Sequence, residues 1–449
     1  MNVRSLRHRL LLFVFLLGSA LVSFAQAPRA FKISHYDLVL EPDIANKSVK
    51  GSVTIDLLTS SFTPGLFQLD CGELTVDSVV EGKQTLTFTQ TNHRLGIAMP
   101  KSKNRDRRIS IEYHGSPKRG IRFFPDRMQV YTVFSTSHWM VCDDDPDERA
   151  SLTTRLIVPA DLTTVGNGRF VTKRTLPDGK LEHRWQEDRD VPSYTYGFVA
   201  GRFRSVTEKA ALPELVYIGE QYSADDLRRV FRDTADMVAF YENRSGVKYP
   251  GASYTQVLAA GGVEQEMSGF TALREKYGQD VLTNESDIWL GAHELAHQWW
   301  GIGVGCQAWT HFWLNEGMAS FMADAYKEHR FGRAEYLKEI EAAQKLYEKV
   351  RDAGKDRSLV FPDWLNPSRE DRTLVYDKGA YVLHLLRAEM GEEAFWDGLR
   401  SYTRKYFGKS VTTGDFQSAM QQATKKDLSP FFKKWVYLSD AKQVSTTTR

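Results

Sequence analysis

The chain has 449 residues, of which 42% are hydrophobic and 26% are charged. This composition excludes a disordered or fibrous protein and predicts a globular one of about two to three domains with ample core. Lys and Arg number 59 against 57 for Asp and Glu, a formal net charge of +2 that supports neither nucleic-acid binding nor attraction to an anionic membrane surface. Because there are only three cysteines, at most one disulfide can form, and the fold cannot depend on disulfides.

Residues 1–25 are predicted to be a signal peptide. A basic start between Arg4 and Arg9 precedes an apolar run from Leu10 to Phe24, and Ala25 provides a small residue before the cleavage point. The alternative is an uncleaved membrane anchor, but the apolar run is shorter than the roughly 20 residues that span a bilayer. We therefore expect an exported protein, periplasmic or extracellular, without stable membrane insertion after cleavage of the signal.

The next part of the chain, residues 26–210, is predicted to be an N-terminal β-rich domain. Short runs of alternating polar and apolar residues, such as Tyr36–Leu40 and Arg108–Tyr113, are broken there by Gly, Pro, Asn and Asp. Alternation of this kind is typical of strands that bury one face, and many short strands in succession indicate a β-sandwich.

From about residue 223 the spacing of apolar residues changes to that of helices. We expect the boundary between Arg204 and Tyr222, a mainly helical domain at residues 211–442 and a frayed tail at residues 443–449. The chain as a whole is thus predicted to be an α+β multidomain protein. The predicted helices cover residues 224–245, 287–300, 313–331, 333–350, 376–390 and 413–424.

The most informative motif is the segment HELAH at residues 293–297, which is separated by eighteen residues from a glutamate, Glu316. Histidines four residues apart lie on one face of a helix, so His293 and His297 can bind the same metal ion. Glu316, in the first turn of the next predicted helix, supplies a third ligand. Imidazole favours zinc over magnesium or calcium, so this set predicts a zinc site with its fourth position open for water.

The second residue of the motif, Glu294, has a different predicted role. It is turned about 100° from His293 on a helix of 3.6 residues per turn, which suits a general base acting on water better than a fourth ligand. We expect Asn284 or Ser286 to cap this helix and Gly301 to end it. The alternative is that the two histidines are ordinary buried residues and that Glu316 is solvated. It does not explain why three potential ligands have a spacing that suits one metal ion.

The segments HELAHQWWG at residues 293–301 and WLNEGMA at residues 313–319 resemble the zinc core of the aminopeptidase N family of gluzincin metallopeptidases. Residues 261–265 are similar to that family's exopeptidase motif, Gly-Ala-Met-Glu-Asn, and residues 376–380 resemble the segment that carries its catalytic tyrosine. The resemblance implies a thermolysin-like zinc metallopeptidase domain behind a β-domain, with one Zn²⁺ per chain. The chain resembles a short form of the family that lacks a large C-terminal helical domain, so we expect an open cleft.

The same resemblance assigns roles around the metal. It implies that the Tyr376 hydroxyl stabilises the tetrahedral oxyanion. It also implies that Glu264 binds the free α-ammonium group of a peptide, a charge-assisted contact that directs cleavage to the bond after the first residue. The glycines before Glu264 would let a backbone edge approach an extended substrate. The predicted substrate-binding segment consists of Gly261, Gly262, Val263, Glu264 and Gln265.

One departure from the family pattern affects the expected function. In larger relatives a Gln and a Glu of the β-domain also hold the substrate amine, whereas Val133 and Ser135 stand at those positions here. We predict an exported zinc aminopeptidase in which water activated by Glu294 attacks the scissile carbonyl of a peptide or protein substrate. The alternatives are a zinc endopeptidase or hydrolase of the same fold that acts on blocked or modified peptides, and a catalytically dead peptide-binding module, against which the intact ligands and base argue.

Overall fold

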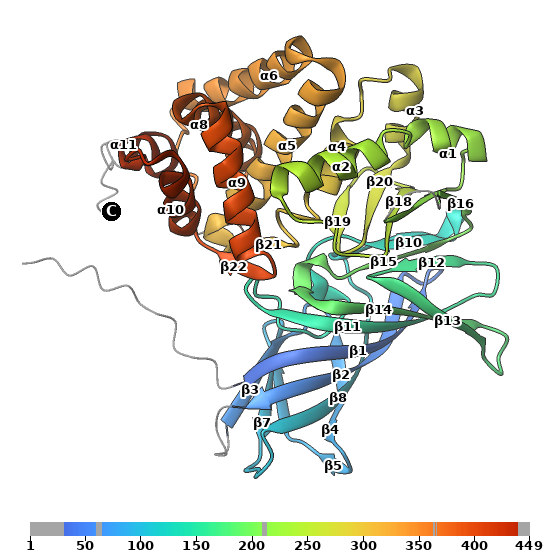
Figure 1. The fold of residues 1–449 in the computed structure, drawn as a ribbon. Coiled ribbons are helices and arrows are strands. Elements are labelled where there is room, and N and C mark those ends of the chain that lie inside the picture. Colours follow the sequence, from blue (N-terminus) through green and yellow to red (C-terminus); the bar gives the residue numbers. More distant parts are fainter. Residues whose placement is uncertain (1–30, 60–64, 209–212, 362–363, 365, 439–449) are drawn as a thin grey trace, which may run out of the picture.

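The computed structural model describes residues 31–59, 65–208, 213–361, 364 and 366–438. The predicted signal peptide and the predicted tail lie outside these residues. A β-rich N-terminal part and a mainly helical C-terminal part are stacked on one another (Figure 1). The predicted fold class, a β-rich domain followed by a mainly helical domain, is confirmed.

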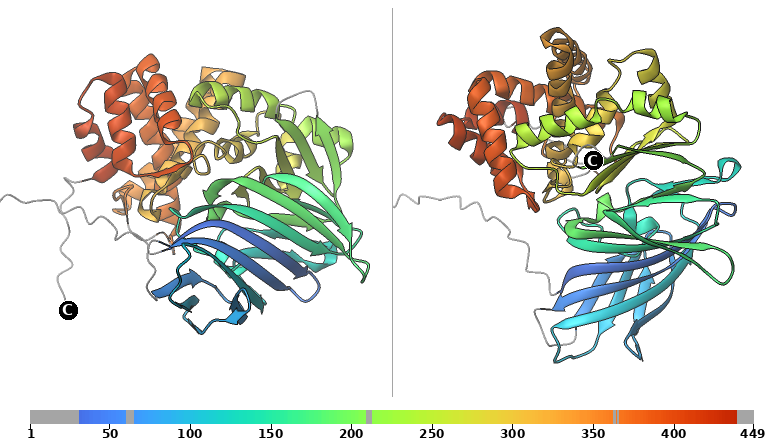
Figure 2. Two further views of the ribbon diagram at one scale, coloured as in Figure 1. Left: turned by 60° about the horizontal axis from the view of Figure 1, so that its bottom comes forward. Right: turned by 45° about the vertical axis from the view of Figure 1, so that its right-hand side comes forward.

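The N-terminal part consists of three sheets that enclose one apolar core (Figure 2). Its strands are β1 (Phe31–Asp43), β2 (Ser48–Thr59), β3 (Gly65–Asp70), β4 (Thr75–Glu81), β5 (Gln84–Thr85), β6 (Phe88–Thr91), β7 (Arg94–Met99), β8 (Asp106–Gly115), β9 (Ile121–Phe124), β10 (Gln129–Thr132), β11 (Arg149–Val158), β12 (Thr163–Gly166), β13 (Arg169–Thr175), β14 (Leu181–Pro192) and β15 (Phe198–Gly201). The largest sheet has the order β13-β14-β11-β1-β2-β8-β4-β5, and the two smaller ones are β12-β15-β10-β9 and β3-β7-β6.

Alternation along the strands explains why these sheets stack. In β2, Val53, Ile55 and Leu57 are at most 1% exposed, whereas the neighbouring Leu58 is 45% exposed. Successive side chains of a strand point to opposite faces, so each strand contributes every second residue to the core. The core between the sheets is built from such residues on β1, β2, β3, β7, β8, β11 and β15.

The C-terminal part begins with a five-stranded sheet of order β16-β17-β18-β20-β19. Its strands are β16 (Arg204–Glu208), β17 (Glu214–Gly219), β18 (Ser253–Ala259), β19 (Gln265–Met267) and β20 (Phe270–Arg274), and a separate pair is β21 (Val304–Cys306) with β22 (Lys409–Val411). β16 pairs antiparallel with β17, so the division predicted between residues 210 and 211 falls inside this sheet. At the far edge, β19 runs antiparallel to β20, and the other neighbours, β17, β18 and β20, are parallel.

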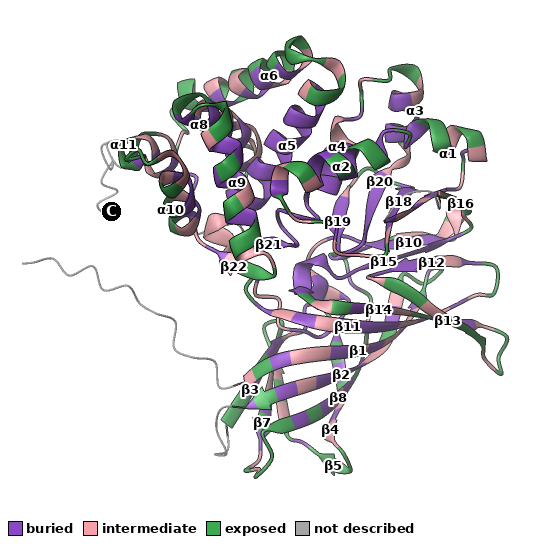
Figure 3. Cartoon of the chain, in the orientation of Figure 1, coloured by how far each residue is buried: buried purple, intermediate pink, exposed green. Residues whose placement is uncertain are grey.

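Helices cover one face of this sheet and continue beyond it (Figures 1 and 3). They are α1 (Ala224–Val230), α2 (Thr234–Ser245), α3 (Glu275–Thr283), α4 (Trp289–Ala296), α5 (Trp313–Phe331), α6 (Arg333–Asp352), α7 (Arg369–Thr373), α8 (Gly379–Met390), α9 (Glu392–Tyr406), α10 (Thr413–Thr424) and α11 (Ser429–Phe432). In Figure 3, α4 and α5 are buried along most of their length, whereas α6 presents exposed residues. No helix in the described ranges is both long and apolar enough to span a membrane.

Several helix predictions are confirmed and others need correction. The predictions for residues 313–331 and 413–424 coincide with α5 and α10, whereas residues 224–245 form two helices, α1 and α2. α4 is shorter than predicted: neither Asn284 nor Ser286 caps it, since Ile288 stands at the N-cap without a side-chain bond, and the helix stops at Ala296, before Gly301. The strands β17–β20 and the helices α3 and α9 had no counterpart among the predicted elements.

The two parts meet at the C-terminal end of α4. The Tyr194 hydroxyl donates to the Gly301 carbonyl at 2.7 Å, and Arg149 Nη2 donates to the Ile302 carbonyl at 2.7 Å. Farther along the interface, Arg127 forms ion pairs with Glu220 and Glu275. The segment that leaves α4 is therefore held directly by residues of the β-rich part.

Candidate metal centre and active site

Three potential metal ligands converge between α4 and α5. His293 Nε2 and His297 Nε2 are 3.1 Å apart, and they lie 3.3 and 3.4 Å from Glu316 Oε2. Each of the three side chains is at most 4% exposed. The structure thus brings together the two histidines and the glutamate that the motif singled out.

The spacing of these atoms fits a zinc ion. Two ligands at about 2.05 Å from zinc, separated by the tetrahedral angle, lie about 3.3 Å apart. The three observed separations agree with that value. The second oxygen of Glu316, Oε1, is buried and has no hydrogen-bond partner in the described part of the chain. We therefore find that the donor set fits zinc.

Groups behind the ligands orient the imidazoles. His297 Nδ1 lies 3.0 Å from the Trp300 carbonyl oxygen, which can only accept, so Nδ1 carries the proton and Nε2 is left free for a metal. His293 Nδ1 lies 3.4 Å from the Ser320 hydroxyl. These partners were not predicted, because a backbone carbonyl leaves no signal in the sequence and Ser320 is an ordinary helix residue.

A further contact fixes the ring plane of His293. Trp289 stacks on it with ring centroids 4.9 Å apart, and the Trp289 indole N–H donates to Asp324 Oδ1 at 2.7 Å. Asp324 is buried on α5, and burial raises its pKa well above the usual value. One histidine ligand is thus held through an aromatic ring that is itself anchored to the neighbouring helix.

The electrostatics of the site call for a cation. Burial alone disfavours a charged imidazole, yet the carboxylates of Glu316 and Glu266 raise the pKa of His297 to about 10. Burial alone would also raise the pKa of Glu316, but the two histidines lower it to about 2. Carboxylates therefore outnumber the positive groups around His297, and a divalent ion would balance them.

The predicted general base lies beside the ligands. Glu294 is 5% exposed, and its Oε2 has no hydrogen-bond partner among the described residues. Burial raises the pKa of Glu294 well above its usual value, and the carboxylates of Glu266 and Glu316 add to that increase. An unpartnered carboxylate of raised pKa next to an open metal position can take a proton from water.

Tyr376 also lies at the site. Its ring is nearly parallel to that of His293, with centroids 6.0 Å apart. It belongs to a single π-helical turn, η5 (Leu374–Lys378), rather than to the start of α8 as predicted. Gly317 and Gly379 allow this turn to approach α5, because a Cβ on Gly317 would lie 2.9 Å from the Gly379 Cα. A close approach of two backbones thus brings Tyr376 to the ligands.

The predicted amine-binding glutamate, Glu264, has another partner. Its carboxylate forms an ion pair of 2.5 Å with Arg274, and its side chain is 18% exposed. Instead, a carboxylate oxygen of Glu266, a carboxylate oxygen of Glu294 and an imidazole nitrogen of His297 all lie within 4.8 Å of one another. Glu266 is 2% exposed, and its Oε1 has no hydrogen-bond partner in the described chain.

Sequence reasoning missed Glu266 because the resemblance to the exopeptidase motif pointed to Glu264 alone, although residues two apart in an extended segment point the same way. The strand pairing distinguishes them: Glu266 lies within β19, opposite Thr271 of β20, whereas Glu264 precedes the strand. The signal in the sequence was a pair of glutamates at alternate positions, and this pattern would have supported either Glu264 or Glu266 as the residue that binds the substrate amine.

In the rest of the predicted substrate-binding segment the two glycines are exposed, Val263 is half-buried and Gln265 is buried. Gly261 has φ +98°, and a Cβ there would lie 2.7 Å from the Phe124 ring, so glycine is required. Gly262 has open space around it. The Val263 carbonyl already accepts a hydrogen bond from the Tyr131 hydroxyl at 3.1 Å. Backbone next to the metal site is therefore accessible at the two glycines.

Comparison with known proteins identifies the family. The Peptidase M1 N-terminal domain matches residues 32–195, and the Peptidase family M1 domain matches residues 231–435. Together these matches cover most of the chain, which belongs to peptidase family M1. The predicted resemblance to aminopeptidase N proteins is thereby confirmed at the level of the family.

Individual relatives are distant in sequence. A probable aminopeptidase 2 of Sulfurisphaera tokodaii is 25% identical over 436 residues, which are 90% of this chain and 53% of that protein. An aminopeptidase N of Lactobacillus delbrueckii subsp. lactis is 27% identical over 445 residues, 90% of this chain and 50% of that protein. The chain thus spans about half the length of these curated relatives.

Solved structures share the fold. A mutant M1 zinc metallopeptidase from Deinococcus radiodurans, bound to a Tyr-Ser-Ala substrate, superimposes with a TM-score of 0.77 at 22% identity. The similarity covers 91% of this chain and 94% of that one. The arrangement of a β-rich part and a helical part is therefore that of an M1 metallopeptidase.

The metal site generates the first prediction. We expect the purified protein to contain one zinc per chain, measured by inductively coupled plasma mass spectrometry, and its melting temperature to fall when a chelator removes the metal. Glu316→Ala should lower the zinc content because it removes a ligand. Glu294→Gln, the matched control beside the same site, should keep it. Equal zinc loss in both variants would show that the two glutamates do not have different roles.

Proposed function

We propose that the chain is a zinc aminopeptidase that removes residues from the free N-termini of peptides. The observation that carries the proposal is Glu266, a buried carboxylate that forms no ion pair with a Lys or Arg among the described residues and lies within 4.8 Å of the candidate base Glu294 and the ligand His297. Relatives named as aminopeptidases, and a substrate-bound structure of the same fold, support it.

The distance from Glu266 to the metal ligands suits a substrate cut after its first residue. In a peptide the α-nitrogen is two bonds from the first carbonyl carbon, a separation of about 2.5 Å. An ammonium group held by a carboxylate must therefore lie next to the groups that act on that carbonyl. Burial of Glu266 makes an ion pair with the ammonium stronger than it would be in water. Glu264, already paired with Arg274, is less suited to this role.

The protein residues divide the chemistry among them. Zinc held by His293, His297 and Glu316 would supply Lewis-acid chemistry at the scissile carbonyl and its attacking water. Glu294 takes the proton from that water and delivers it to the leaving nitrogen as the peptide bond breaks. The Tyr376 hydroxyl donates a hydrogen bond to the carbonyl oxygen as negative charge develops there. Burial and the neighbouring carboxylates raise the pKa of Tyr376 well above its usual value, so its donor proton is retained.

A second candidate function is hydrolysis of blocked or internal peptide bonds by the same site. The observation in its favour lies in the β-rich part, where Val133 and Ser135 offer no carboxylate to a substrate amine. Under this alternative Glu266 would not discriminate between free and blocked termini. Nucleic acid is not proposed as a partner, since the near-neutral charge balance of the chain gives no reason for it.

We also propose export to the periplasm or the exterior of the cell. The support is the sequence at residues 1–25, a basic start followed by an apolar run and small residues. The protein would then act on extracytoplasmic peptides.

The division of catalytic roles predicts that Glu294→Gln lowers kcat by about 10²–10⁴-fold, because it removes the base, and that Tyr376→Phe lowers it by about 10²–10³-fold. Both should leave zinc content and KM for an amino-acid anilide nearly unchanged. Steady-state kinetics on metal-analysed samples checks this. A Tyr376→Phe variant with wild-type kcat would remove the tyrosine from the mechanism.

The amine-binding role predicts that the wild type cleaves an amino-acid anilide and spares its acetylated counterpart. Glu266→Gln should lower kcat/KM for the free-amine substrate by roughly 2 to 4 kcal/mol, the cost of removing one partner of a desolvated ion pair. Glu264→Gln, two residues away, breaks only the pair with Arg274 and should keep the preference. The reverse outcome, loss in Glu264→Gln alone, would return the role to Glu264. Equal cleavage of both substrates by the wild type would favour the second candidate function.

Export predicts a shortened N-terminus. Expressed in a bacterial host with an outer membrane, the full chain should be recovered from the periplasmic fraction, with Gln26 as its first residue by N-terminal sequencing. Recovery of an intact N-terminus in the cytoplasmic fraction would contradict the proposal, and an intact N-terminus in the membrane fraction would favour the uncleaved anchor.

A further inference from the structure

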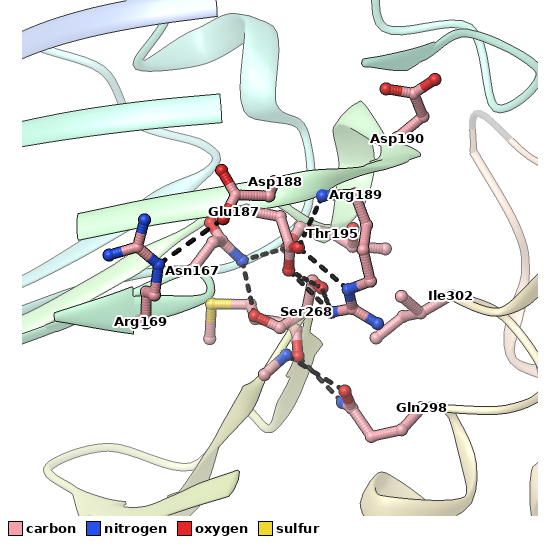
Figure 4. A network of polar contacts seen from close by, with 12 residues as sticks. Asn167, Arg169, Glu187, Asp188, Arg189, Asp190, Thr195, Ser268, Gln298 and Ile302 are labelled. Atoms are coloured by element: carbon pink, nitrogen blue, oxygen red, sulfur yellow. Dashed lines mark hydrogen bonds and ion pairs between the residues drawn. The ribbon is translucent and has the colours of Figure 1, made fainter. Parts of the chain in front are cut away.

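The backbone around Glu266 is fixed from two directions. The Asn167 side-chain amide, in the β-rich part, donates to the Ser268 carbonyl at 3.0 Å. The Gln298 side-chain amide, next to the ligand His297, donates to the Met267 carbonyl at 2.9 Å. Figure 4 shows both contacts converging on the turn that follows β19. The strand that carries Glu266 is thus tied to both the β-rich part and the metal-binding segment.

The same turn is tied to an ion pair of the β-rich part. Arg189 Nη2 donates to the Ser268 hydroxyl at 2.6 Å, and that hydroxyl lies 2.6 Å from Glu187 Oε2 (Figure 4). Glu187 and Arg189 are themselves paired at 2.7 Å. These contacts hold the turn that follows β19, but none of them reaches the carboxylate of Glu266.

One side chain does reach that carboxylate. Gln265 Nε2 donates to Glu266 Oε2 at 2.8 Å and also to the Glu266 carbonyl at 2.8 Å. The other end of the same amide, Gln265 Oε1, accepts the backbone N–H of Phe134 at 2.7 Å. Gln265 is 1% exposed, so these contacts are shielded from water. The carboxylate is left with one oxygen held by an amide and the other, Oε1, without a partner in the described chain.

The loop that Gln265 reaches is strained. Phe134 and Ser135 have φ of +43° and +45°, in the left-handed region that non-glycine residues rarely adopt. Such a conformation costs free energy and persists only where neighbouring contacts hold it. The bond from the Phe134 amide to Gln265 is one such contact, and it joins the β-rich part to the residue beside Glu266.

We propose that Gln265 is a positioning residue for recognition of the substrate amine, locking the Glu266 carboxylate against the strained loop at Val133–Ser135. The proposal rests on the proposed aminopeptidase function. A neutral amide suits the task because it orients the carboxylate without cancelling its charge, so the ion pair with an ammonium group remains available. Glu264 shows the contrast: an arginine orients its carboxylate and also neutralises it.

Binding of two matched ligands tests the proposal without relying on turnover. Leucine hydroxamate and 4-methylpentanoyl hydroxamate share a metal-binding group and a side chain, and differ only in the α-amine. Isothermal titration calorimetry on zinc-loaded protein gives Kd for each, and the ratio of the two Kd values measures amine recognition. We expect the wild type to prefer the amine-bearing ligand by about 30-fold or more.

Gln265→Met keeps the length of the side chain and removes its hydrogen bonds. The preference for the amine should fall about ten-fold, with Kd for the des-amino ligand and zinc content unchanged. The matched control is Gln256→Met, a buried glutamine on β18 whose side chain accepts from Thr234 at 2.6 Å, and it should keep the wild-type ratio. If the Met variant fails to fold, Gln265→Asn serves, since its shorter side chain cannot span both contacts.

The outcomes separate the two levels of the proposal. Absence of an amine preference in the wild type would overturn the aminopeptidase function itself. A wild-type preference that survives in Gln265→Met, or an equal weakening of both ligands with loss of zinc, would overturn the positioning role alone. A ratio that falls selectively in the Gln265 variant and not in the Gln256 control supports it.

Discussion

Three carboxylates and two imidazoles buried together are the constraint on which the site depends. Glu266, Glu294 and Glu316 surround the two ligand histidines, each at most 5% exposed. Burying charge without compensation is costly, so positive charge supplied to this cluster would stabilise the fold. A divalent ion at the histidines supplies part of it, and a substrate ammonium at Glu266 would supply more. Under the proposed function, one excess of negative charge would favour both a metal cofactor and a cationic substrate.

Contacts between neighbouring elements of the fold hold this cluster in place. α4 is a short helix, and the segment that follows it is held by the β-rich part, where Tyr194 binds the Gly301 carbonyl and Arg149 the Ile302 carbonyl. α5 supplies Glu316 and also Asp324, which anchors the tryptophan stacked on His293. The π-helical turn at Tyr376 approaches α5 across two glycines. Each functional group is therefore attached to an element that is fixed by at least one contact outside its own segment.

How much of this the sequence could predict depends on the range of the interactions involved. His293, Glu294 and His297 were predictable because helical spacing places them, Glu316 was predictable from its place in the motif that follows, and the long periodic segment of α5 was predicted with its observed bounds. Glu266 was not, because the choice between it and Glu264 is made by pairing of β19 with β20. The shortness of α4 was missed because no cap or glycine marks its end: after Ala296 the backbone continues in tight turns, in which Gln298 N–H donates to the Leu295 carbonyl and Trp299 N–H to the Ala296 carbonyl. The orienting carbonyl of Trp300 is a backbone group and leaves no trace in residue type.

The contact between Gln265 and the Phe134 amide has a consequence for modularity. By topology the chain is two units, and each has its own apolar core. Yet the loop of one unit sets the geometry of a side chain in the other through a single buried amide. A helical unit joined to a different β-rich unit would keep its metal ligands but lose the contact between Gln265 and the Phe134 amide. Under the proposed function the two units depend on each other. Recombination between distant relatives at the boundary would preserve hydrolysis more readily than the preference for substrates with a free amine.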